Sequence, residues 1–78
     1  MKSLLLLEDD MTYRTVLSGI LEKTYIVYQA NTIAGAIQVL SMKNIDYICS
    51  DYHLPDGIGI QILEYLRNSN KVIPTIIM

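Results

Sequence analysis

Short apolar, β-prone runs alternate along this sequence with stretches in which apolar residues recur at helical spacing. The runs that predict strands are Ser3–Leu7, Tyr25–Ala30, Ile45–Ser50 and Val72–Met78. The stretches that predict helices are Met11–Lys23, Ile33–Met42 and Ile58–Asn68. Because strands and helices alternate with short connections throughout, we expect an α/β fold with a parallel sheet, right-handed crossovers and helices on both faces.

Capping and turn residues support these element boundaries. Asp10 can cap the first helix, and Asn31 and Thr32 offer an N-cap for the second. Asn70 lies where the third helix is expected to end, and Pro74 is tolerable near the start of the last strand. No repeat, linker or second domain interrupts the pattern, so we expect one domain over residues 1–78.

Charge and composition narrow the function classes. Six basic and eight acidic residues give a formal charge of −2, which argues against nucleic acid as a direct partner of this segment. No apolar run approaches the roughly 20 residues of a membrane span, so we expect a cytoplasmic protein that does not contact the membrane. The single cysteine, Cys49, lies in a predicted buried strand and is expected to act as a small apolar residue.

Acidic residues follow two of the predicted strands at the point where each strand ends. Glu8 and Asp9 follow the first strand, and Asp51 follows the third. If those strands are neighbours in a parallel sheet, the three carboxylates converge at its carboxyl edge, where open α/β folds bind ligands. Such a group would favour a hard cation with oxygen ligands, for which Mg²⁺ is the natural candidate. The alternative is that all three are solvated loop acids.

Three segments carry a resemblance to a known family. Leu4–Asp10 (LLLLEDD), Asp51–Gly59 (DYHLPDGIG) and Ile73–Met78 (IPTIIM) resemble the response-regulator receiver domain of two-component signalling, in order and at the family's spacing. Within the second segment, Pro55 and Gly59 match the loop that closes behind the family's phosphoacceptor. The resemblance implies the flavodoxin-like receiver fold, with the four predicted strands in the order 2-1-3-4.

The resemblance also implies roles for individual residues. Asp51 would be the phosphoacceptor, receiving a phosphoryl group from a sensor histidine kinase in a Mg²⁺-dependent reaction. Asp9 matches the acid that binds Mg²⁺ directly, and Glu8 matches the neighbour that usually acts through a metal-bound water. His53 occupies the position whose backbone carbonyl completes the metal shell, whereas Asp10 is expected to be a helix cap.

The sequence departs from the family pattern at its C-terminal end. Receivers continue with a Ser or Thr switch residue, another helix, a strand carrying a Lys, and a final helix, but this sequence stops at Met78. The domain over residues 1–78 is therefore expected to be an incomplete receiver. The lysines present in the sequence are all expected to lie away from the three carboxylates, so none of them replaces the missing lysine. These are Lys2, Lys23, Lys43 and Lys71.

Two functions remain open on these grounds. The first is a phosphoacceptor domain that is not an enzyme, beyond Mg²⁺-dependent self-phosphorylation and dephosphorylation. The second is a non-catalytic dimerising module derived from a receiver. In either case Val72–Met78 is expected to form an open sheet edge and to drive self-association. A nucleotide-binding domain is disfavoured because no Gly-rich loop follows the first strand. A phosphatase would want a second acid at position 53, where the sequence has His53.

Overall fold

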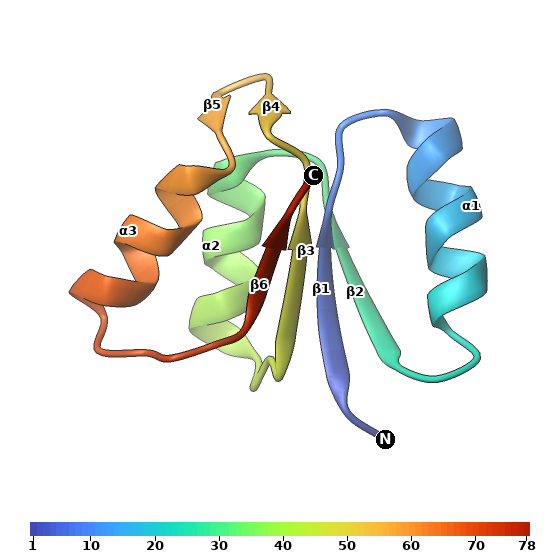
Figure 1. The fold of residues 1–78 in the computed structure, drawn as a ribbon, viewed down its shortest axis with the longest axis horizontal. Helices are drawn as coiled ribbons and strands as arrows, with labels where there is room; N and C mark the ends of the chain where they lie inside the picture. The colour runs from blue at the N-terminus through green and yellow to red at the C-terminus, as the bar shows by residue number, and fades with distance from the viewer.

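Parallel strands form a sheet in the order β2-β1-β3-β6 in the computed structural model, which describes residues 1–78 (Figure 1). The strands of this sheet are β1 (Ser3–Leu7), β2 (Ile26–Ala30), β3 (Tyr47–Ser50) and β6 (Thr75–Ile77). The helices are α1 (Met11–Leu21), α2 (Ile33–Met42) and α3 (Ile60–Asn68). The α/β class, the parallel sheet and the strand order expected from the sequence are confirmed.

Strand β1 lies at the centre of the sheet, between β2 and β3. Its last residue, Leu7, is in register with Ala30 of β2 and with Ser50 of β3. All of its leucines are buried, because helices cover both faces of a central parallel strand. The carboxyl ends of β1, β2 and β3 are therefore level, at what we call the carboxyl rim; the opposite edge is the amino rim.

Helices α2 and α3 cover one face of the sheet and enclose most of the buried apolar side chains. Leu5 and Leu7 of β1 point to this face and join a core cluster of 11 buried residues. Leu40 of α2 and Leu66 of α3 belong to the same cluster, as does Ile48 of β3. This side of the sheet is therefore a conventional hydrophobic core.

Helix α1 lies on the opposite face, beside β1 and β2 (Figure 1). Its only fully buried residue is Ser18, whose hydroxyl accepts a hydrogen bond from the Gln29 side chain at 3.0 Å. Val16 and Ile20, which belong to the apolar stripe that predicted the helix, are 56% and 58% exposed. The helix forms as expected, but three of the five stripe residues, Tyr13, Val16 and Ile20, are exposed, and only Leu17 and Leu21 are partly buried.

The segment after β3 differs from the sequence expectation. The stretch expected to be a turn followed by a helix from Ile58 contains a short antiparallel hairpin, β4 (His53–Leu54) and β5 (Gly57–Ile58). Helix α3 therefore begins at Ile60. Gly57 has φ 153°, a conformation that L side chains rarely adopt, which explains a glycine at this hairpin position.

The remaining boundaries differ by a few residues. Strand β6 begins at Thr75, not at Val72, because its register with β3 starts there. Pro74 has no N–H to donate and contributes only its carbonyl, which accepts from the Ile48 N–H at 3.0 Å. Asn70 adopts φ 55°, the left-handed conformation that commonly follows a helix end. None of the helices has both the length and the apolar composition that crossing a membrane requires.

Candidate functional site

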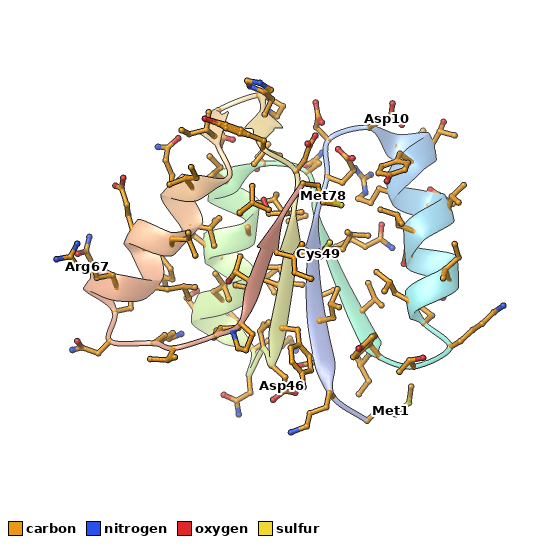
Figure 2. The ribbon with its side chains drawn as sticks, viewed as in Figure 1. Met1, Asp10, Asp46, Cys49, Arg67 and Met78 are labelled. Atoms are coloured by element: carbon orange, nitrogen blue, oxygen red, sulfur yellow. The ribbon has the colours of Figure 1, made fainter.

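Three carboxylates meet at the carboxyl rim. Glu8, Asp9 and Asp51 each offer an oxygen atom, and these atoms all lie within 4.8 Å of one another. The sheet causes this convergence, since β1 and β3 are adjacent and parallel and the Asp51 N–H donates to the Leu7 carbonyl at 2.8 Å. Figure 2 shows Asp10, the residue that follows Asp9, at the same rim, where α1 begins. We call Glu8, Asp9 and Asp51 the acid cluster.

Glu8 is the most enclosed member of the acid cluster. Only 4% of its surface is exposed. Burial is the main reason that the pKa of Glu8 is raised above its ordinary value, and the nearby Asp51 carboxylate raises it further. The Asp10 N–H, which donates to Glu8 Oε2 at 3.4 Å, acts in the opposite direction. A cation placed among the three carboxylates would remove this repulsion, so the donor set suits a divalent metal ion.

The backbone around Asp51 is closely packed. The Ser50 hydroxyl donates to the Asp51 carbonyl at 2.9 Å, and the Tyr52 N–H donates to Asp51 Oδ1 at 2.8 Å. Gly59 closes the loop from behind, since its N–H donates to the Tyr52 carbonyl at 2.7 Å. A Cβ at Gly59 would overlap with the Asp51 carbonyl and the Ser50 hydroxyl, so this position requires glycine.

The β4–β5 hairpin is fixed to helix α2 by one side chain. Asp56 Oδ1 accepts a hydrogen bond from the Ile33 N–H at 2.8 Å, and Oδ2 accepts one from the Ala34 N–H at 3.0 Å. These two N–H groups hold the pKa of Asp56 below its ordinary value. Since Thr32 already caps the same helix through the Gly35 N–H, α2 receives two caps, one of them from the loop that follows Asp51.

The other residues singled out from the sequence lie as follows. The side chain of His53 is exposed and its ring packs edge-on against Tyr52, with centroids 4.8 Å apart, so its imidazole takes no part in the acid cluster. The metal-binding role of its backbone carbonyl stays a prediction. Asp10 caps α1 by accepting from the Tyr13 N–H at 2.8 Å. Lys71 donates to the Leu40 carbonyl at 2.8 Å, far from the acids.

Cys49 is partly exposed, which differs from the buried position expected. It lies on the α1 side of β3, where the covering of the sheet is incomplete. Burial is still the main cause that raises the pKa of its thiol, and a raised thiol pKa disfavours the reactive thiolate form. The residue that sequence reasoning overlooked is Arg14, whose guanidinium donates to the Glu8 carbonyl at 2.8 Å. A basic residue in the first turn of a helix that follows three acids was the available signal.

Comparison with known families decides the identity of the fold. The sequence pattern of the response regulator receiver domain matches residues 4–78. The chain belongs to the response regulator receiver domain family. The resemblance found in the sequence is therefore confirmed, and with it the flavodoxin-like fold. Receiver domains are, as a family, the phosphoryl-accepting domains of two-component response regulators.

Solved structures of receivers are close to this one. The MaeR response regulator bound to beryllium trifluoride is 32% identical, with a TM-score of 0.89, over 100% of this chain and 66% of that one. The non-phosphorylated HemR receiver domain from Leptospira biflexa is 31% identical, with a TM-score of 0.89, over 99% and 63%. TrrA from Thermotoga maritima, solved with Mg²⁺ and beryllium fluoride, shares the fold at 24% identity and a TM-score of 0.89, over 99% and 68%.

This receiver chain spans about two-thirds of the length of the solved structures that it matches. A comparison with curated protein sequences finds no match.

Proposed function

We propose that this receiver domain accepts a phosphoryl group on Asp51 from a sensor histidine kinase, in a reaction that depends on Mg²⁺. The observation that carries the proposal is the convergence of Glu8, Asp9 and Asp51 at the carboxyl rim. The family membership supports it, since receivers of two-component systems accept phosphoryl groups. The reaction would take place in the cytoplasm, and the domain would act as a phosphoacceptor and not as an enzyme in its own right.

The proposed metal site uses the acid cluster and one backbone group. Asp9 and Asp51 would supply carboxylate oxygens directly, the Glu8 carboxylate would act through a metal-bound water, and the His53 carbonyl would complete the set. Oxygen donors of this kind suit Mg²⁺, which commonly binds one or two carboxylates and keeps several waters. When bound, Mg²⁺ would neutralise the repulsion between the Asp51 carboxylate and the incoming phosphoryl oxygens.

The contribution of the chain itself is to orient the nucleophile. The Tyr52 N–H holds Asp51 Oδ1, so we assign Oδ2 as the attacking oxygen. This oxygen would form a bond to phosphorus while the phosphorus–nitrogen bond of the kinase phosphohistidine breaks, and the imidazole nitrogen would keep the electron pair. The tight packing of Gly59 behind Asp51 keeps the carboxylate at the rim through this exchange.

A second function is favoured by a separate observation. Strand β6 is an edge strand that pairs only with β3, and Ile76 within it is 66% exposed. An exposed apolar edge is a template for pairing with a second copy. The alternative is therefore a dimerising module that keeps the acid cluster but is not switched by phosphorylation.

Treatment with acetyl phosphate and Mg²⁺ tests the proposal. We expect intact-mass spectrometry to show addition of one phosphoryl group to the wild-type chain and none to Asp51→Asn. Asp10→Asn is the matched control, because asparagine also caps helices and Asp10 lies beside the acid cluster without belonging to it.

Beryllium fluoride separates the two functions. A phosphoacceptor is expected to bind it in the presence of Mg²⁺. The matched TrrA structure holds Mg²⁺ with beryllium fluoride, and the matched MaeR structure is bound to beryllium trifluoride. Metal binding with no response to beryllium fluoride or acetyl phosphate would reject the phosphoacceptor function and favour the dimerising module.

A further inference from the structure

The turn that carries Glu8 and Asp9 is held by few hydrogen bonds from its own backbone N–H groups. The Glu8 N–H donates to the Ala30 carbonyl at 3.0 Å, and the Asp10 N–H makes a long bond of 3.4 Å to the Glu8 side chain. Asp9 itself is exposed. We call Glu8–Asp10 the acidic turn. A turn with three like charges has no electrostatic reason to keep its carboxylates together, so another group must hold it.

Arg14 provides that group through a branched contact. Its Nη1 donates to the Glu8 carbonyl at 2.8 Å, and its Nε donates to Gln29 Oε1 at 3.1 Å. Gln29 Nε2 in turn donates to the Ser18 hydroxyl at 3.0 Å, and this hydroxyl donates to Glu22 at 3.1 Å. We call Arg14, Gln29, Ser18 and Glu22 the polar seam. It connects the acidic turn to β2 and to the body of α1.

Arg14 is also the only basic residue at the carboxyl rim. The other basic residues lie beside strand starts or helix ends at the amino rim: Lys2, Lys23, Lys43, Arg67 and Lys71. Figure 2 shows Arg67 on the left flank of the molecule, at the end of α3 remote from the hairpin, and Met1 and Asp46 at the bottom of the view. The guanidinium of Arg14 therefore lies at the carboxyl rim, opposite to the rim where all the other lysine and arginine residues are found.

We propose that Arg14 is a positioning residue for the metal site, acting through the Glu8 backbone without touching the metal. The inference rests on the proposed function, since it concerns how the acid cluster is arranged to bind Mg²⁺. The planar guanidinium makes both contacts from one rigid group, which a lysine ammonium at the same position cannot reproduce. Partners outside the ligand shell commonly change metal affinity by about 10–100-fold when they are removed.

The proposal makes a prediction of definite sign. If Arg14 acted only as a nearby positive charge, its removal would strengthen Mg²⁺ binding, because a cation near the site repels the metal ion. If Arg14 positions the acidic turn, its removal weakens Mg²⁺ binding although a repulsive charge has been lost. Arg14→Lys keeps the charge and loses the geometry, so it separates the two roles.

Isothermal titration calorimetry with Mg²⁺ tests this on the wild type, on Arg14→Ala, Arg14→Lys and Gln29→Leu, and on a control variant. We expect about 10–100-fold weaker binding for Arg14→Ala and a smaller loss for Arg14→Lys. Gln29→Leu leaves Arg14 in place but removes one of its two partners, and we expect a loss of several-fold. Arg67→Ala is the matched control, because it removes an arginine at the amino rim, and its affinity should equal that of wild type.

Amide hydrogen exchange of the metal-free chains gives a readout that does not depend on Mg²⁺. We expect the Glu8 and Asp10 amides to exchange faster in Arg14→Lys than in wild type, while amides of the α2–α3 core keep their rates. Unchanged or tighter Mg²⁺ binding in Arg14→Ala, with unchanged exchange of these two amides, would overturn this inference alone. A wild-type chain that fails to bind Mg²⁺ would overturn the proposed metal site, and the inference with it.

Discussion

The two sides of the sheet are built on different principles. On the α2–α3 side, apolar side chains such as Leu5, Leu40 and Ile62 are almost completely buried. On the α1 side, the helix is attached by the polar seam, and Val16, Ile20 and Ile76 remain exposed. The first side buries apolar area, which stabilises without strict demands on direction. The second side relies on hydrogen bonds, which fix positions and angles.

The two sides of the sheet therefore contribute differently, one mainly to stability and the other mainly to the position of the site. Core burial supplies most of the stability of residues 1–78, since it holds most of the buried apolar residues. The polar seam adds little net stability, because each hydrogen bond replaces one to water. It does determine where the acidic turn lies. We therefore expect mutations on the first side to unfold the chain and mutations on the second side to alter the site or the surface.

The largest effect should come from truncating the core. Leu40→Ala removes a side chain that is 1% exposed and should cost about 2–5 kcal/mol, a large part of the 5–15 kcal/mol typical of a small domain. Val16→Ala truncates a side chain of α1 that is 56% exposed, and it should change the free energy of unfolding by no more than about 0.5 kcal/mol. Urea unfolding followed by circular dichroism measures both. Equal losses for the two variants would show that α1 contributes to the core.

The sheet and the acid cluster were predictable because both depend on local patterns. Helical and strand periodicity gave the alternation, and a parallel sheet places the ends of β1 and β3 together. That is sufficient to bring Asp51 to Glu8 and Asp9. Asp10 followed in the same way, since an N-cap is recognised by residue type and position.

Side-chain hydrogen bonds between residues that are distant in sequence were not predictable in this way. Asp56 is 23 positions from Ile33, and Gln29 is 15 positions from Arg14. Neither contact leaves a periodic signal. The exposure of most of the α1 apolar stripe was also not predictable, because periodicity shows that a helix is amphipathic and not how much of its apolar face is covered. The β4–β5 hairpin was missed because its strands have only two residues each.

A smaller effect concerns self-association of the 78-residue chain. Because β6 has an open edge and Ile76 is 66% exposed on the α1 side, we expect light scattering at low micromolar concentration to show dimers or larger species. Ile76→Lys should shift the equilibrium toward monomer by at least about tenfold, since it removes an apolar contact and introduces repulsion between copies.

Val72→Lys is the matched control for this experiment. Val72 is 98% exposed and lies outside β6, so the added charge should leave the association unchanged. A compact and stably folded wild-type monomer at the same concentration would show that the exposed α1 side needs no second copy, and the dimerising alternative would lose its support.

The smallest effect tests how the β4–β5 hairpin caps helix α2 through Asp56. Asp56→Asn leaves one acceptor oxygen where the carboxylate offered two, so one of the Ile33 and Ala34 N–H groups loses its partner. We expect the thermal midpoint at pH 7 to fall by on the order of a few degrees. Thr32 keeps α2 capped in the variant, so the fold should persist.

The pH dependence of this difference follows from the direction of the Asp56 pKa shift. The Ile33 and Ala34 N–H groups lower the pKa of Asp56 in the folded chain, so the unfolded chain binds the proton more readily. The stabilisation is therefore present above the unfolded pKa of about 3.9 and is lost as the pH falls through the folded pKa. Thermal unfolding from pH 7 to pH 2 should show the midpoints of wild type and Asp56→Asn converging on the acid side. A gap that stays constant to pH 2 would mean that the charge of Asp56 plays no part in holding the β4–β5 hairpin to α2.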